Sequence, residues 1–309
     1  MSRRRAALHA AAQLLCSAAV LGWLARDAAE RGLRLDLAAL APAPLLLALV
    51  VKALSLIVHQ HRLHRALPAP RPAWGLVTAA GLIGGLLNMV LPARAGDAGL
   101  VAALATRLGV GWAPATAAVA RVTLMEIWVF GLACLGALRA AWRLHALDPA
   151  RVDGVAAVLA AGVVGLGLGA LGLRAWARRR RPDTGAGPAL GGGPIGVDLG
   201  LTVLEIGAMI AAFTLAIQAA GAQAADPLST TTLILAVSAT AAALLPPAWG
   251  AGPAAACALV LGAQNVPQDV ILRAAAAWWI VSQGPMAALG LLSLGLAPQL
   301  LRSPPAAAP

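Results

Sequence analysis

The sequence predicts an all-α integral membrane protein, a polytopic helical bundle that forms a single transmembrane domain over residues 1–309. Hydrophobic residues make up 60% of the chain and charged residues only 11%, whereas roughly 25% of a soluble domain is charged. The mean hydropathy is +0.82. The apolar residues also gather in runs near the ~20 residues that a spanning helix needs. Neither a soluble globule nor a disordered chain has this composition.

The apolar runs predict eight full spans in chain order. They cover residues 6–25, 37–58, 73–91, 113–138, 152–173, 196–220, 228–245 and 270–296. Two shorter runs, 97–108 and 253–263, cannot span a bilayer alone and are predicted to be broken or re-entrant helices. The first run follows a basic head, Arg3–Arg5, as in a signal peptide. Because further spans follow, we interpret it as an uncleaved first span.

The basic connectors predict how the chain is oriented in the membrane. Arginines gather before the first span, in residues 59–71 and in residues 174–182. Lys and Arg favour the cytoplasmic side of spans, so both termini and the linker 174–195 are predicted to be cytoplasmic in a chain that crosses ten times. A rival model has two re-entrant short helices, crosses eight times and places the linker outside. Abundant Ala, Gly, Arg and Pro indicate a GC-rich genome and hence a bacterial inner membrane.

The two halves of the chain share a Leu-Pro motif followed by glycine four residues after the proline. The motif residues are Pro92 and Gly96 in the first half, and Pro246, Gly250 and Gly252 in the second. In both halves a short apolar run ending in Leu-Gly follows, and then a long span. These units, 73–138 and 228–296, are predicted to form an inverted repeat, although chance similarity in an Ala-, Gly- and Pro-rich chain is the alternative. Paired broken helices in inverted repeats are typical of secondary transporters, with the substrate near the bilayer midplane.

Acidic residues inside the apolar runs are candidates for a transport pathway. Glu126 and Glu205 both lie deep in their runs, and Asp198, Thr202 and Glu205 share one helix face at spacings i, i+4 and i+7. A charged side chain at mid-depth costs about 2.5–3.5 kcal/mol on insertion scales, so such residues are functional candidates by default. The alternative is that these acids are structural partners of arginines.

Arginines near the first motif are candidates for binding a phosphate. Arg94 and Asp97 flank the break, and a half-helix that begins near Asp97 would direct free N–H groups at an anion. An internal Arg94–Asp97 bridge is the alternative. Arg121 lies about eight residues inside its span and is five residues from Glu126, so the two side chains point in different directions. Arg121 is the best candidate for a substrate phosphate, because a guanidinium binds phosphate bidentately.

Two other groups of polar residues are interpreted as structural or interfacial. His59, His61 and His64 resemble a metal cluster, but no Cys or neighbouring carboxylate completes a site. Contact with lipid headgroups is the favoured interpretation, and no metal or cofactor is expected. Arg273 follows Asp269 by four residues at a span end, so we predict an ion pair between them.

Other function classes find no support in the sequence. The net charge of +11 comes from arginines in the connectors rather than from a basic face on a folded domain, so no nucleic-acid partner is expected. Cys16, Cys134 and Cys257 lie in apolar runs and are interpreted as small buried residues. Nucleophile-elbow, phosphate-loop and zinc-protease motifs are absent from the sequence. We therefore do not expect an enzyme.

The motif of the first half resembles a known membrane family. Asn88, Leu91-Pro92, Arg94, Gly96 and an acid at position 97 are followed by Arg121 and Glu126. This pattern is similar to the flippase-like transmembrane region of the lysylphosphatidylglycerol synthase family, including free-standing members that lack the soluble synthase domain. The resemblance covers about 75–295 and adds Asn88 to the candidate substrate-binding residues. The chain departs from the family pattern in having Asp97 where Glu is usual and no acid after Gly252.

The resemblance implies translocation of a phospholipid or a polyprenyl-linked lipid. The membrane lipids would be the partners, and the headgroup phosphate would bind between the two Leu-Pro motifs. A non-transporting scaffold that docks a glycosyltransferase through residues 178–181 is the alternative, and a membrane-embedded transferase is a third class. No particular protein partner follows from the sequence.

Overall fold

The computed structural model describes residues 36–90, 95–143, 195–224, 226–244, 251–297 and 300, together with three isolated positions near the N-terminus. Nearly all of the predicted spans 6–25 and 152–173, and of the linker 174–195, lie outside the described residues. The same holds for both breaks, and therefore for Pro92, Arg94, Pro246 and Gly250.

The described residues are helical throughout, apart from turns and caps. The helices are α2 (Pro42–Ala66), α3 (Trp74–Val90), α4 (Ala95–Ala102), α5 (Trp112–Arg143), α7 (Ile195–Ala219), α8 (Pro227–Leu244), α9 (Ala251–Gly262) and α10 (Gln268–Leu296). A 3-10 turn, Leu37–Ala39, precedes α2, and a π-helical turn, Ala103–Arg107, follows α4. These elements occupy the predicted apolar runs, so the helical character of those runs is confirmed where the structure describes them.

Four of these helices are long and apolar enough to cross a membrane. They are α2, α5 over Trp112–Ala140, α7 and α10, and each has a mean hydropathy of 1.4 or more in its best window. The described part of the chain is therefore that of an integral membrane protein. The eight full spans and the inverted repeat stay predictions.

Helix α2 continues eight residues beyond the predicted run 37–58. It begins with Pro42, which suits the first turn of a helix. It ends at Ala66 because Leu67 precedes Pro68 and takes the extended conformation that a following proline imposes. The prediction that residues 59–66 form part of a connector was therefore wrong. The basic side chains in this stretch lie on two further turns of α2.

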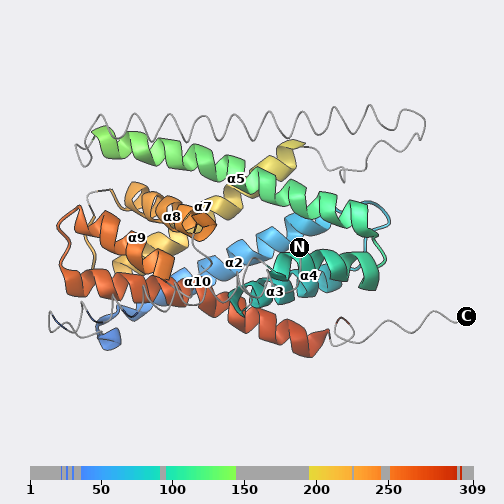
Figure 1. Cartoon of the computed structure of the whole chain (residues 1–309), viewed down its shortest axis with the longest axis horizontal. Coiled ribbons are helices and arrows are strands. Elements are labelled where there is room, and N and C mark those ends of the chain that lie inside the picture. The colour runs from blue at the N-terminus through green and yellow to red at the C-terminus, as the bar shows by residue number, and fades with distance from the viewer. Residues whose placement is uncertain are drawn as a thin grey trace, which may run out of the picture.

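The long helices are arranged around the antiparallel pair α2 and α7. In Figure 1, α5 runs along one side of the molecule and α10 along the other, with α2 and α7 between them. Helix α3 packs on α10, and α8 packs on α5. The colours in Figure 1 show that α2 and α7 run in opposite directions, as do α5 and α10.

Each predicted Leu-Pro unit contains an antiparallel helical hairpin. In the first hairpin, Asn88 of α3 bonds to Asp97 of α4. In the second, the side chain of Gln264, just after α9, donates to the hydroxyl of Thr230 at the start of α8 at 3.0 Å. The short helices therefore return toward the ends of the molecule from which α3 and α8 start.

Glycines let α3 approach both α4 and α10 closely. A Cβ atom at Gly96 of α4 would overlap the carbonyl oxygen of Gly84 on α3. A Cβ at Gly290 of α10 would lie 2.8 Å from Cβ of Leu86 on α3. Glycine is therefore required at these contacts for the observed spacing of α3 against α4 and α10.

Two apolar cores hold the bundle. One surrounds the stacked rings of Phe213 on α7 and Trp278 on α10, whose centroids lie 4.1 Å apart. The other surrounds Leu63 at the end of α2 and Leu104 in the π-helical turn. The polar residues of the candidate site lie where α2, α5 and α7 meet.

Candidate functional site

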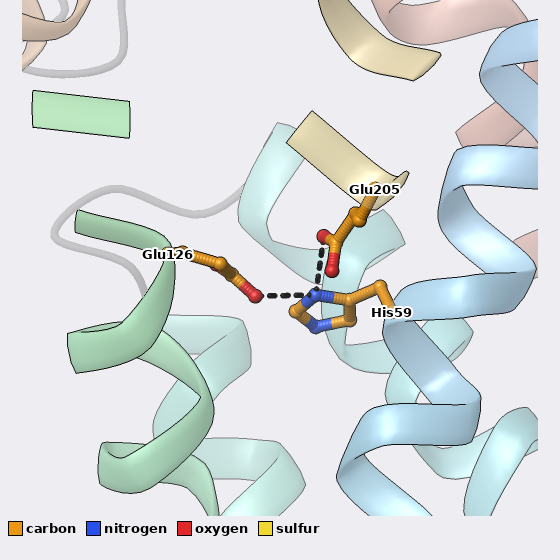
Figure 2. A group of neighbouring side chains, drawn as sticks. All are labelled: His59, Glu126 and Glu205. Atoms are coloured by element: carbon orange, nitrogen blue, oxygen red, sulfur yellow. Dashed lines mark hydrogen bonds and ion pairs between the residues drawn. The ribbon is translucent and has the colours of Figure 1, made fainter. Parts of the chain in front are cut away.

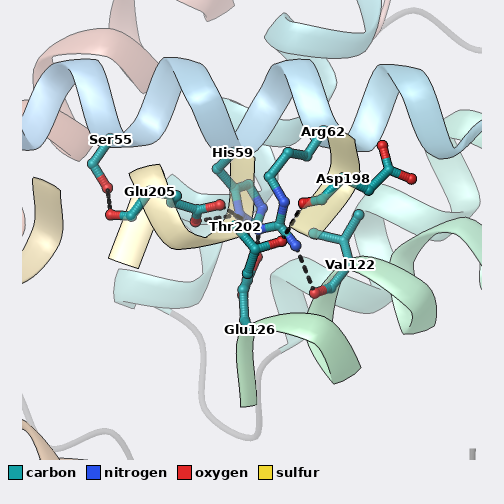
Figure 3. A network of polar contacts seen from close by, with 8 residues as sticks. All are labelled: Ser55, His59, Arg62, Val122, Glu126, Asp198, Thr202 and Glu205. Atoms are coloured by element: carbon teal, nitrogen blue, oxygen red, sulfur yellow. Dashed lines mark hydrogen bonds and ion pairs between the residues drawn. The ribbon is translucent and has the colours of Figure 1, made fainter. Parts of the chain in front are cut away.

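A network of charged and polar side chains joins three helices (Figure 3). Its members, which we call the polar network, are His59, Arg62 and Arg65 on α2, Arg121 and Glu126 on α5, and Asp198, Thr202 and Glu205 on α7. The helices come from distant parts of the chain, so the network is a product of the fold rather than of local sequence.

On α2 and α7, the network residues are spaced so that they lie on one face of each helix. On α7, Asp198, Thr202 and Glu205 are all buried, which confirms the predicted polar stripe. On α2, His59 and Arg62 lie one turn apart and direct their side chains at the same acidic residue of α7. The pairing is antiparallel, because Arg65 near the end of α2 meets Asp198 near the start of α7.

One end of the network is rich in acids, and we call it the His59 cluster. The Nη1 atom of Arg62 lies 2.9 Å from Oε1 of Glu126 and also bonds to Oε2 of Glu205. The Nδ1 atom of His59 lies 2.8 Å from Oε1 of Glu126 and 3.0 Å from Oε1 of Glu205 (Figure 2). Both carboxylates therefore share the same two nitrogen groups.

Backbone contacts fix the positions of the His59 cluster. The second guanidinium nitrogen of Arg62 donates to the carbonyl oxygen of Val122 at 3.2 Å. The hydroxyl of Ser55, one turn before His59, donates to the carbonyl oxygen of Glu205 at 3.2 Å. These bonds connect α2 to the backbones of α5 and α7, and so fix the position of Arg62 and His59 relative to Glu126 and Glu205.

The other end of the network is rich in arginine, and we call it the arginine pair. Arg65 from α2 places Nε 3.3 Å from Oδ1 of Asp198, and Arg121 from α5 bonds to Oδ2 of the same carboxylate. The hydroxyl of Thr202 donates to the backbone carbonyl of Asp198 at 2.6 Å. Two guanidinium groups from two helices therefore converge on one carboxylate.

The two ends of the network have opposite local charge. At the arginine pair, two positive groups face one negative group. In the His59 cluster, two carboxylates face the single guanidinium of Arg62. The two ends are therefore suited to ions of opposite sign, an anion beside the two guanidinium groups and a cation beside the two carboxylates.

The structure brings together five of the residues predicted as site candidates. Arg121, Glu126, Asp198, Thr202 and Glu205 all belong to the polar network. The partner of Arg121 in the network is an acid on another helix, which is the structural alternative considered for the predicted acids. Their roles in substrate binding and transport stay predictions.

The remaining described candidates lie at the helical hairpins. Asn88 donates from Nδ2 to Oδ1 of Asp97 at 2.7 Å, which links α3 to the first turn of α4. Gly96 lies at the close contact between the same two helices. Gly252 is the second residue of α9.

Sequence reasoning missed His59, Arg62 and Arg65 as network members. Residues 59–71 were interpreted as a connector whose histidines contact lipid headgroups. The sequence signal that could have found them is the absence of a helix-breaking residue before Leu67-Pro68, which lets α2 continue through all three positions. His61 is exposed, and His64 bonds to the carbonyl oxygen of Pro72 at 3.0 Å.

The geometry also bears on metal binding. Ligand atoms of His59, Glu126 and Glu205 lie within 4.8 Å of one another. The sequence shows no carboxylate near His59, but the fold brings Glu126 from α5 and Glu205 from α7 beside it. However, Arg62 already bonds to both carboxylates, so a divalent cation would have to displace its guanidinium.

Comparison with known proteins gives one match. No curated protein and no solved structure matches the chain. The family model described as the lysylphosphatidylglycerol synthase TM region matches residues 10–290. This match covers both hairpins and every member of the polar network. The chain therefore belongs to the family of lysylphosphatidylglycerol synthase transmembrane regions.

Proposed function

We propose that the protein is a flippase of the bacterial inner membrane for a phospholipid or a lipid-linked substrate, and that it binds the anionic headgroup at the arginine pair. Family membership supports a protein that contacts membrane lipids. The chain would act as a transporter rather than as an enzyme, with both termini in the cytoplasm.

The observation that carries this proposal is the convergence of Arg65 and Arg121 on Asp198. A headgroup phosphate is negatively charged and has two non-bridging oxygens, which a planar guanidinium group can bind bidentately. The side chain of Arg65 is 26% exposed and that of Arg121 is 7% exposed. A phosphate would therefore meet Arg65 first and reach Arg121 deeper in the bundle.

Asp198 would serve as the internal anion while no substrate is bound. It is a buried partner of the Arg121 guanidinium and lies beside the more exposed guanidinium of Arg65. A bound phosphate would replace the carboxylate as the partner of both arginines. The exchange trades one anion for another at the guanidinium groups, and the displaced carboxylate of Asp198 would then have to bind a proton or turn toward water.

The arrangement of helices supports alternating access. The helices of the two halves correspond in order: α2 to α7, α3 to α8, α4 to α9 and α5 to α10. Corresponding helices pack in corresponding ways, so that α3 packs on α10 just as α8 packs on α5. The helices α2 and α7 correspond to each other and run in opposite directions. This pattern supports an inverted repeat that extends beyond 73–138 and 228–296 to include α2 and α7.

The ion pair between Arg65 and Asp198 supports the orientation in which 59–71 and 174–195 share one side of the membrane. Arg65 lies one residue before the end of α2, and Asp198 lies in the first turn of α7. Their contact places these two helix ends at the same end of the bundle. The eight-crossing model would place those ends on opposite sides.

The test is a headgroup-accessibility assay in liposomes that contain the purified protein and a fluorescent phosphatidylglycerol. We expect Arg65→Ala and the double variant Arg121→Ala/Asp198→Ala to lose at least about tenfold in rate, since tenfold corresponds to about 1.4 kcal/mol of lost binding. Arg121→Lys should keep partial activity, because an ammonium binds phosphate without the bidentate fit.

The matched control is Arg139→Ala, which removes an exposed arginine from α5. It should flip lipid at the rate of the unchanged protein. Full transport by a folded double variant would reject the arginine pair as the headgroup site. Absence of transport by the unchanged protein would favour the scaffold alternative, whose sensitivity should lie in residues 178–181.

A further inference from the structure

We infer that the His59 cluster is a proton-binding site, with His59 as the proton carrier, and that it couples proton movement to the translocation proposed above. The inference rests on that proposed function for its role in transport. The site itself rests on the geometry of three side chains on three helices (Figure 2).

Hydrogen bonding determines which ring nitrogen carries a proton in every state. Ionised carboxylates only accept hydrogen bonds, and Nδ1 of His59 lies 2.8 Å and 3.0 Å from oxygens of Glu126 and Glu205. Nδ1 is therefore the donor. The exchangeable proton binds to the lone pair of Nε2, which converts a neutral imidazole into an imidazolium ion.

The charge at this end of the network changes with that proton. The carboxylates of Glu126 and Glu205 carry two negative charges, and the Arg62 guanidinium in contact with both carries one positive charge. With neutral His59 the cluster has a net charge of −1. With the imidazolium ion the net charge is zero, so the cluster is built to hold one further cation.

The other charged groups that face this region are already engaged or lie farther off. Arg65 and Arg121 bond to Asp198. Lys52 lies two turns before His59 on α2, and its ammonium is 5.8 Å from the centroid of the Phe213 ring. Among the described titratable groups, His59 is the base in direct contact with both carboxylates.

A proton suits the site better than a metal ion. A divalent cation would compete with Arg62 for both carboxylates. A proton adds at Nε2 without displacing any of the hydrogen bonds at Nδ1 or any contact of Arg62. Binding of a proton therefore changes the charge of the cluster without breaking any of its contacts, whereas loss of the proton weakens the attraction of His59 for both carboxylates.

The location of the cluster links proton binding to the arginine pair. Glu126 belongs to α5 and Glu205 to α7, so the charge on His59 sets the attraction that holds these two helices to α2. Asp198 lies seven residues before Glu205, or about 10 Å along the same helix. A shift of α7 against α5 when the proton leaves would therefore change both sites together, and the coupling would be reciprocal.

The first experiment imposes a proton gradient of about one pH unit on liposomes that contain the purified protein, with fluorescent phosphatidylglycerol as the probe. We expect the initial rate to change by up to about tenfold for one coupled proton. His59→Gln should lose this response. His61→Gln, which removes an exposed imidazole two residues away, should keep it. A full response in His59→Gln would overturn the inference.

The second experiment tests the site without any substrate. Spin labels replace Leu132 on α5 and Val203 on α7, both exposed, in a chain whose cysteines are changed to alanine. The distance between the labels should shift between acidic and alkaline pH, and the shift should vanish in His59→Gln but not in His61→Gln. If His59→Gln does not fold, Glu126→Gln should abolish the shift because it removes one carboxylate.

The two experiments separate the two proposals. A pH-independent distance in the unchanged protein would overturn the proton site whatever the transport assay gives. Lipid movement that ignores the gradient would overturn the coupling and leave the flippase proposal intact. No lipid movement under any condition would reject the flippase proposal, while the distance measurement would still judge the proton site.

Discussion

Arg121 on α5 and Asp198 on α7 form a buried ion pair between residues that are 77 positions apart in the sequence. Arg65 from α2 approaches the other oxygen of the same carboxylate. One acidic side chain therefore connects three helices. Removing it leaves two guanidinium groups without this partner, while removing one arginine leaves the other in place.

The pairing predicts strong coupling between Arg121 and Asp198 in folding stability. Asp198→Ala should lower the free energy of unfolding by about 3–5 kcal/mol, because it removes the carboxylate that two guanidinium groups contact. Arg121→Ala should cost less, because Arg65 still contacts Asp198. The double variant should recover much of this loss. Thermal unfolding in detergent measures all three, with Arg139→Ala as the surface control. Losses that simply add in the double variant would contradict the coupling.

The close contact of α3 and α4 predicts that Gly96 tolerates no side chain. In Gly96→Ala, the new Cβ would overlap the carbonyl oxygen of Gly84 and lie 2.6 Å from Oδ1 of Asn88. Overpacking of this kind costs about 1–3 kcal/mol. Gly99→Ala, on the same short helix, is the control, because its Cβ would lie 3.7 Å from the nearest atom, Cδ1 of Leu87. Equal melting temperatures for the two variants would show that α4 is not held at this distance.

Two substitutions of Asp97 can distinguish the role of its charge from the role of its hydrogen bond to Asn88 at the first hairpin. Asp97→Asn keeps an oxygen that accepts from Nδ2 of Asn88, so it should lower the melting temperature less than Asp97→Ala does. If the charge of Asp97 serves transport, Asp97→Asn should flip lipid at least about tenfold more slowly, a loss of about 1.4 kcal/mol. Normal transport by Asp97→Asn would assign Asp97 a structural role.

The orientation model predicts opposite labelling at two connector positions. A cysteine at Gly187, in the arginine-rich linker, should resist a membrane-impermeant thiol reagent in intact cells. A cysteine at Gln223, in the connector after α7, should react. The eight-crossing model predicts the reverse at both positions. Ready labelling of Gly187→Cys would therefore reject the cytoplasmic linker and the inverted repeat built on it.

Features that depend on local spacing were predictable from the sequence. The runs of apolar residues gave the positions of the helices because a membrane span needs a fixed length. The ion pair of Arg273 with Asp269 is confirmed, at 3.1 Å, because residues four apart on a helix are always neighbours. The stripe of Asp198, Thr202 and Glu205 followed from the same geometry.

Features that depend on packing between helices were not predictable. The spacing within α5 predicts that Arg121 and Glu126 point in different directions, but it does not identify their partners on α2 and α7. The end of α2 was placed too early because a basic stretch normally lies in water. Here Arg62 is almost fully buried, at 3% exposure, because two carboxylates from other helices compensate its charge.

The shared position of Arg62 has a consequence for how relatives of this chain can differ from it. One guanidinium contacts acids from two helices. An apolar residue at this position would therefore remove the guanidinium partner of two carboxylates in one substitution. A relative with a neutral residue at position 62 is therefore expected to carry neutral residues at positions 126 and 205 as well. Sequence variation across the family should show these three positions changing as a set.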